Sequence, residues 1–167
     1  MTSSCKDFLL FLEVNNPKPI IGDLFERKFG SPFNVNYGHH QIAFYKKNAQ
    51  HFIPIGYLNL LPYKKVILVG GGMTDGNAFK HVSPDHSKQI SEAGGILYLG
   101  LKHAFSYYSD DCIAFFGHVN NKRAYEVDIK AGFIETGHKN LVVNFHNPIS
   151  PWRKKRLIKM VTHLGPF

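Results

Sequence analysis

A run of apolar residues, Val66–Val69, leads directly into the glycines Gly70–Gly72. Continuous β-branched and apolar side chains are typical of a central strand that is covered on both faces. Glycine has no side chain to block a ligand, so this strand would end in accessible backbone amides where a sheet ends or separates. The segment therefore predicts a ligand-binding strand end or, equally well, a strand that is merely kinked or bulged.

The glycines do not form a nucleotide-binding signature. In the dinucleotide fingerprint a third glycine is required, but Asp75 stands in its place and no helix starts at once. A P-loop is also excluded, because the chain contains no Gly-Lys-Ser/Thr sequence.

Extended segments precede the glycine run. Apolar and polar residues alternate from His40, a turn is predicted over Lys46–Gln50, and Phe52–Leu61 forms a second extended run. A further turn at Pro62–Lys65 leads into Val66–Val69. These patterns predict three successive antiparallel strands.

Two helices are expected before these strands. Ser4 and Asp7 resemble a capping box ahead of the apolar set Phe8–Leu12, which predicts a short helix. Apolar spacing over Ile20–Phe29 predicts a second helix, and Gly30 is a typical stop for it.

The second half of the chain alternates between helices and extended segments. Gly94-Gly95 opens an apolar helix that runs to Phe105, and a helix N-terminus of this kind can bind phosphate. The other predicted elements are a helix start at Ser83-Pro84, a strand over Cys112–Phe116, a helix from Asn121 stopping at Gly132, an extended run over Phe133–Phe145 and a basic helix opened by Ser150-Pro151. The expected fold is α/β (α+β), as a single domain over residues 1–167.

Length and composition set the class of protein. With 167 residues and 44% hydrophobic residues, the chain can bury one core. No apolar segment near the start is long enough for a signal peptide or a membrane span, so a cytoplasmic location and no membrane association are expected.

Cys5 and Cys112 lack a CxxC spacing and are expected to be reduced. Because His39, His40 and His51 have no carboxylate or thiol at ligand spacing, no metal is expected.

Positive charge is concentrated at the C-terminal end. The net charge is +8, and no acidic residue follows Glu135. This bias suits a polyanion, which could be nucleic acid, a membrane surface or a phosphorylated cofactor. Trp152 with Arg153–Arg156 could clamp a nucleic acid, but a helix docked through Trp152, Leu157, Val161 and Leu164 explains the pattern equally well, and a solvated basic face is favoured.

The segment from Asn121 to Phe133 carries the strongest motif. It reads Asn121-x-x-Ala124-x-x-x-Asp128-x-x-x-Gly132-Phe133 and is preceded by the strand Phe115-Phe116 and followed by Thr136-Gly137. Together with the upstream strands and the glycine-opened helix, residues 40–137 resemble the GNAT superfamily of acyl-CoA-dependent N-acyltransferases.

This resemblance implies a mixed, mostly antiparallel sheet in which two neighbouring strands splay into a V-shaped notch. The pantetheine of acetyl-CoA, the implied co-substrate, pairs with strand backbone in that notch, and the pyrophosphate rests on the helix that follows. The implied cofactor-binding residues are Val69, Gly70, Gly71, Gly72 and Met73 for the pantetheine, Gly94, Gly95 and Ile96 for the pyrophosphate, and Asn121 at the helix after the second notch strand.

The resemblance also points to catalytic residues. The family's tyrosine that often protonates the departing thiolate falls at Asp128, and an aspartate with an ordinary pKa of about 4 is ionised at neutral pH unless burial raises that pKa. Tyr125, one helical turn earlier, is the expected substitute. His118 and Asp75 lie near the ends of the predicted notch strands and are the candidate bases for the amine.

The predicted function is transfer of an acetyl group from acyl-CoA to a primary amine of a small-molecule or peptide acceptor. The alternative is a catalytically inactive GNAT-like fold that binds a ligand or a nucleic acid, although nucleic acid is not the favoured partner.

Overall fold

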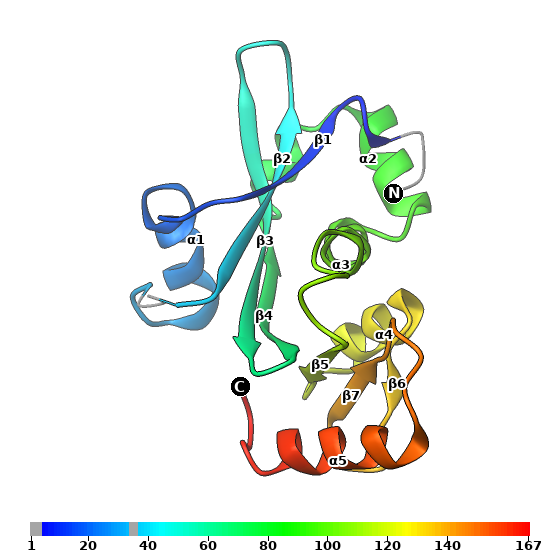
Figure 1. Ribbon diagram of the computed structural model, residues 1–167. Helices are drawn as coiled ribbons and strands as arrows, with labels where there is room; N and C mark the ends of the chain where they lie inside the picture. Colours follow the sequence, from blue (N-terminus) through cyan, green and yellow to red (C-terminus); the bar gives the residue numbers. More distant parts are fainter. Residues whose placement is uncertain (1–4, 34–36) are drawn as a thin grey trace.

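The computed structural model describes residues 5–33 and 37–167. The strands are β1 (Leu9–Glu13), β2 (His39–Lys46), β3 (Phe52–Tyr63), β4 (Val66–Thr74), β5 (Ala114–His118), β6 (Ile134–Glu135) and β7 (Leu141–Asn144). In the described part of the chain they form one seven-stranded sheet in the order β1-β2-β3-β4-β5-β7-β6 (Figure 1). Only the β4–β5 pair is parallel, so the mixed, mostly antiparallel sheet predicted from the sequence is confirmed.

Helices cover both faces of this sheet (Figure 1). They are α1 (Lys18–Phe29), α2 (Pro84–Glu92), α3 (Ile96–Tyr107), α4 (Lys122–Ala131) and α5 (Pro151–Thr162), with a 3-10 helix, η2 (Ala78–His81), before α2. Ile42 packs in the core cluster with α1, whereas its neighbour Ala43 packs in the cluster that contains α2 and the start of α3. Because adjacent strand residues point to opposite faces, α1 and α3 lie on opposite sides of the sheet. Among the described residues, no helix has the length and apolar character needed to cross a membrane.

The helix predicted at Phe8–Leu12 is wrong, because this segment contributes to strand β1. β1 pairs antiparallel with β2, with Leu9 opposite Tyr45, and both Leu9 and Phe11 are buried. Consecutive apolar residues fit a strand as well as a helix, and pairing with a distant strand decided between them. Ser4 of the expected capping box lies outside the described residues.

Other local signals are confirmed. α1 ends at Gly30 in the left-handed conformation, with φ 69°. The Ser83 hydroxyl accepts a hydrogen bond from the His86 amide at the start of α2. The carbonyl oxygen of the Asn121 side chain accepts hydrogen bonds from the first amides of α4, and that helix ends at Gly132 with φ 113°.

The extended run after Phe133 is a hairpin. β6 and β7 pair antiparallel, and the turn between them includes Gly137 and Asn140 at positive φ. β7 also pairs antiparallel with β5. The sheet thus continues beyond β5 through two short strands of the segment that was expected to be one extended run.

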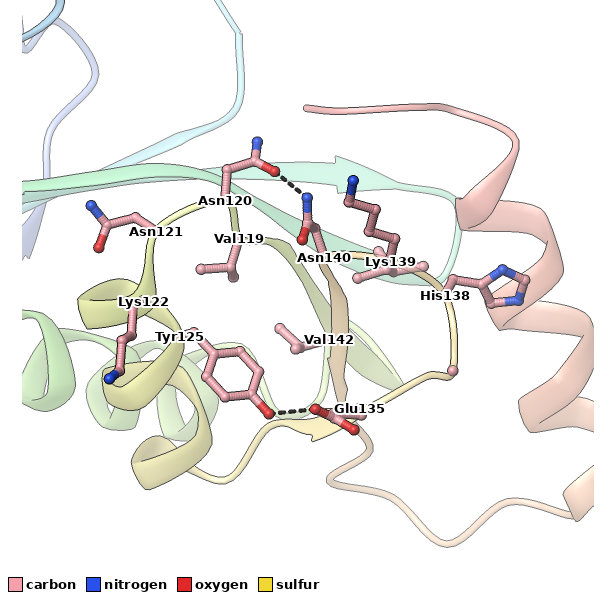
Figure 2. Close-up of a pocket in the computed structure, with 12 residues that line it drawn as sticks. Val119, Asn120, Asn121, Lys122, Tyr125, Glu135, His138, Lys139, Asn140 and Val142 are labelled. Carbon is pink, nitrogen blue, oxygen red and sulfur yellow. Dashed lines mark hydrogen bonds between the residues drawn. The ribbon is translucent and has the colours of Figure 1, made fainter.

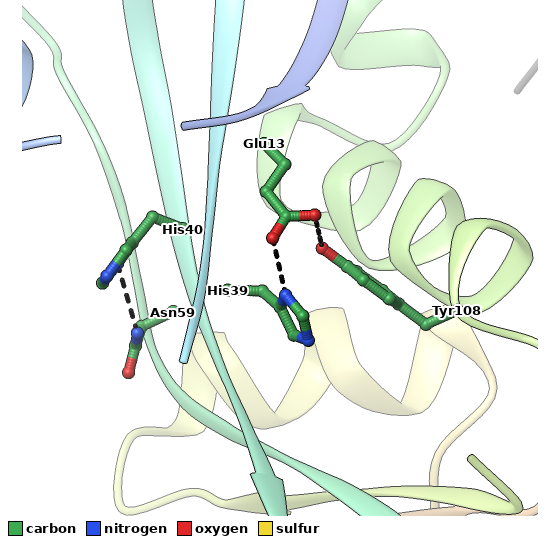
Figure 3. A network of polar contacts seen from close by, with 5 residues as sticks. All are labelled: Glu13, His39, His40, Asn59 and Tyr108. Carbon is green, nitrogen blue, oxygen red and sulfur yellow. Dashed lines mark hydrogen bonds and ion pairs between the residues drawn. The ribbon is translucent and has the colours of Figure 1, made fainter. Parts of the chain in front are cut away.

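A polar network connects β1, β2 and the C-terminal end of α3 (Figure 3). The Glu13 carboxylate receives hydrogen bonds from His39, at 2.6 Å, and from the Tyr108 hydroxyl, at 2.8 Å. Burial acts to raise the pKa of Glu13, but these two hydrogen bonds, together with electrostatic attraction to His39 and His40, outweigh it and hold the pKa below its ordinary value. The network fastens α3 to the sheet at the end opposite its glycine-rich start.

Candidate active site

Strands β4 and β5 separate after a short parallel pairing. Their register runs from Val66 opposite Ala114 to Val69 opposite Gly117, whereas β4 continues against β3 as far as Thr74. The β3–β4 register shifts beside Gly70, so this glycine occupies a β-bulge at the point of separation. Among the described residues, the β5-facing edge of β4 beyond Val69 therefore has no strand partner, and its backbone groups are available to a ligand.

Two adjoining hollows follow this separation. One, of about 490 Å³, lies between the end of β4 and the start of α3, and the other, of about 290 Å³, lies between β4, β5 and α4. The residues that line both are Phe29, Gly72, Leu97, Asn121, Ala124 and Val127. The hollows thus form one continuous cleft across the notch, which we call the notch cleft.

Gly72 and Gly71 of β4 differ in what a side chain at each position would contact. A Cβ atom at Gly72 would lie 2.8 Å from a Leu58 methyl group and 3.1 Å from a Leu97 methyl group, so this glycine lets α3 pack closely. A Cβ atom at Gly71 would meet nothing within 4 Å. Gly71 is therefore not required by packing and leaves open space beside the unpaired backbone.

The N-terminus of α3 forms one wall of the notch cleft. Gly94 and Gly95 have φ values of 110° and 87°, which side chains other than glycine rarely adopt. The first amides of a helix have no intrahelical partners and carry the positive end of the helix dipole. Lys28 and Arg123 line the same hollow, so this wall presents both amides and cations to an anion.

Asp128 projects from α4 toward the separation of the strands. Its carboxyl lines the notch cleft, and burial raises its pKa from 3.8 to about 7. At neutral pH a substantial fraction of this carboxyl therefore carries a proton. Asp128 was expected to be ionised unless burial raises its pKa, and desolvation by the packed sheet and helix does raise that pKa.

Tyr125 faces a different hollow from Asp128. Its hydroxyl donates a hydrogen bond of 2.6 Å to Glu135, and this bond raises the pKa of Tyr125 (Figure 2). The side chain lines a separate hollow of about 440 Å³, together with Asn120 and Asn140, whose amides are hydrogen-bonded to each other. Tyr125 does not line the notch cleft, whereas Asp128, one turn further along α4, does.

The two candidate bases differ in position. His118 lines the notch cleft, and its ring lies 6.1 Å from that of Phe167. Asp75 does not line the cleft. Its carboxylate forms an ion pair with Arg27 at 3.6 Å and accepts a hydrogen bond from the Asn77 amide.

Most residues assigned to cofactor binding meet at the cleft. Those that line it are Val69, Gly71, Gly72, Met73, Gly94, Gly95, Ile96 and Asn121, with Gly70 at the bulge. Sequence reasoning missed Lys28, Phe29 and Arg123. Arg123 follows the Asn121 cap closely and could have been found from the motif, but α1 brings Lys28 and Phe29 from a distant part of the chain.

The fold can be compared with known proteins. No family model matches the chain, and no curated protein matches it. A solved structure of ribosomal-protein-S5-alanine acetyltransferase from Vibrio fischeri superposes with a TM-score of 0.57 and 11% identity, covering 86% of this chain and 96% of that chain. The spermidine/spermine N-acetyltransferase SpeG from Vibrio cholerae, in mutant form, gives a TM-score of 0.51 and 14% identity, covering 83% and 91%.

The chain has the GNAT fold. At such identities the likeness establishes the fold and nothing finer. The comparison confirms, at the level of the fold, the resemblance inferred from residues 40–137.

Proposed function

We propose that this protein transfers an acetyl group from acetyl-CoA to a primary amine. The observation that carries the proposal is the separation of β4 from β5 beyond Val69 and Gly117, next to the N-terminus of α3. The two compared structures are of acetyltransferases, which supports acyl transfer as the reaction class. The acceptor could be a small molecule or a peptide.

The cleft has the features that acetyl-CoA requires. The unpaired edge of β4 offers backbone groups to the amides of pantetheine, and the open space at Gly71 leaves room for the chain. The α3 amides, Lys28 and Arg123 supply positive potential for the phosphates. No group of three His, Cys, Asp or Glu side chains suited to a metal ion occurs in the described residues, and the absence of a metal stays a prediction.

In the proposed reaction, the amine nitrogen forms a bond to the thioester carbonyl carbon, and the carbon–sulfur bond breaks. Backbone amides at the β4 edge would stabilise the negative charge that develops on the carbonyl oxygen. His118, within the cleft, would accept the proton that the amine loses. Asp75 is a weaker candidate for this role because Arg27 already pairs with its carboxylate.

Asp128 is our candidate for the acid that protonates the departing thiolate. It lines the cleft, and its pKa of about 7 allows it to hold a proton at neutral pH and then release it. Tyr125, the substitute expected from the sequence, would have to act from the neighbouring hollow. The protonated carboxyl also removes one reason for the alternative of an inactive, binding-only fold.

The proposal is tested in two steps. Acetyl-CoA at millimolar concentration should raise the melting temperature, since a ligand that binds only the folded state stabilises it. Release of free thiol should then be measured with a panel of polyamines, N-terminal alanine peptides and lysine peptides. No thermal shift would overturn the cofactor assignment, whereas a shift without thiol release from any acceptor would favour the binding-only alternative.

A further inference from the structure

The exposed side of α5 carries a dense positive charge. Residues 136–167 contain six Lys and Arg residues and no acidic residue. On α5, Arg153, Lys155, Arg156 and Lys159 are exposed, and His138 and Lys139 are exposed on the nearby β6–β7 turn. We call these six residues the α5 basic surface.

Intramolecular ion pairs do not account for this charge. The cations that form ion pairs in the described part of the chain are Arg27, His39 and Lys88, none of which belongs to α5. α5 instead packs on the sheet through apolar side chains, with Val161 buried and Leu157 and Ile158 partly buried. The charges are therefore not needed to hold the helix in place.

Trp152 is not part of that packing. The alternative of a helix docked through Trp152 is wrong, because 68% of this residue is exposed. Leu164 is 40% exposed and also contributes less than expected. The Arg156 guanidinium lies 5.5 Å from the centre of the Trp152 ring. An exposed indole beside a guanidinium is a surface on which a nucleobase can stack.

Neighbouring hollows that share lining residues lie between this surface and the notch cleft. One, of about 430 Å³, lies between α5 and the β6–β7 turn and is lined by His138, Lys155 and Lys159. His138 also lines the hollow that contains Lys139 and Asn121 (Figure 2). Asn121 in turn lines the notch cleft. A flexible polyanion could follow this path from α5 to the cleft.

We propose that the α5 basic surface binds the phosphate backbone of single-stranded RNA, with an unpaired base stacked on Trp152. RNA loops present unstacked bases and closely spaced phosphates, which match an aromatic ring among cations. Duplex DNA keeps its bases inside the helix and would leave Trp152 unused. An anionic membrane would attract the same cations, but lysines and arginines surround Trp152 without a wide apolar face for insertion into lipid. The inference does not depend on acyl transfer.

The test measures binding of a fluorescent, unstructured 20-nucleotide RNA by anisotropy between 50 and 200 mM KCl. The double variant Lys155→Ala, Lys159→Ala should lower the slope of log affinity against log salt by about 1.4, or roughly 0.7 for each lost phosphate contact. Trp152→Ala should weaken binding about tenfold and leave the slope unchanged, because stacking is not ionic.

The matched control is Lys46→Ala, Lys47→Ala, which removes two exposed lysines at the β2–β3 turn. This control should bind RNA as the wild type does, and all variants should keep the thermal shift with acetyl-CoA. Failure of the wild type to bind RNA at 50 mM KCl would overturn the proposal. So would an equal loss in the control variant, or binding to vesicles with phosphatidylserine but not to RNA.

Discussion

Asp128 lies directly against Gly117, with its Oδ2 atom 3.3 Å from the position that a Cβ atom would take at this glycine. The absence of a side chain at Gly117 thus lets the α4 carboxyl approach the strand where β4 and β5 separate. Burial at this position raises the pKa of Asp128 to about 7. Gly117 on β5 therefore leaves room for the candidate acid at the separation of the strands.

We expect Asp128→Asn to lower the turnover of acetyl transfer by at least about tenfold, because general acid catalysis is typically worth about 10²- to 10⁴-fold. Asparagine keeps the shape of the side chain but has no acidic proton. Tyr125→Phe, the loss that the sequence alone ranked as more damaging, should reduce turnover much less. Steady-state kinetics of both variants decides between the two residues, and the reverse ranking would return the role to Tyr125.

The pH profile gives a second view of Asp128. Its pKa in the folded protein is raised, so the protonated, donating form is lost as the pH rises through about 7. Wild-type turnover with saturating acceptor should therefore show a descending limb centred near that pH. Asp128→Asn should lack this limb in its residual activity. A descending limb that persists in the variant would assign it to another group.

Gly71→Leu should abolish the thermal shift with acetyl-CoA and leave the fold intact. A Cβ atom at Gly71 meets no atom within 4 Å, so the added side chain would occupy the open space beside the β4 edge. Gly76→Leu is the matched control, since Gly76 is exposed and also has open space at its Cβ position. Calorimetric titration with CoA should show normal affinity for the control, and equal affinity of both variants would place the cofactor elsewhere.

Arg123→Glu should weaken binding of CoA, because Arg123 lines the hollow at the N-terminus of α3 and glutamate would repel the phosphates. Lys65→Glu makes the same charge change at an exposed residue in the β3–β4 turn and serves as the control. The affinity loss for Arg123→Glu should be smaller when the ligand is pantetheine, which carries no phosphate. A loss of the same size for both ligands would mean that Arg123 does not contact phosphate.

Tyr108→Phe should lower the free energy of unfolding by about 1.5 kcal/mol at neutral pH, since it removes a hydrogen bond to a charged group. The pKa of Glu13 is lowered in the folded state, so its stabilising effect is present above the unfolded pKa and is lost as the pH falls through the folded value. The difference between wild type and variant in urea unfolding should therefore shrink in acid. Tyr107→Phe, at a residue that is 60% exposed, should unfold like the wild type.

The sequence by itself determined helix α1 and most of the elements after His40. Local signals were sufficient there: Asn121 and Ser83 cap helices, Gly30 and Gly132 end them, and alternation marks β2 and β3. These signals act within one or two turns of the chain, so they do not depend on distant partners. The resemblance to the GNAT superfamily rested on the same local motifs and gave the residues that meet at the notch cleft.

Tertiary structure alone decided features that depend on long-range contacts. β1 is a strand because β2 offers it a paired edge, although its apolar residues fit a helix equally well. The raised pKa of Asp128 follows from its burial. Lys28 and Phe29 reach the cleft because α1 packs against one face of the sheet. Trp152 is exposed because Val161 and its apolar neighbours already fill the contact between α5 and the sheet. Burial and proximity are properties of the packed chain, and no local pattern in the sequence encodes them.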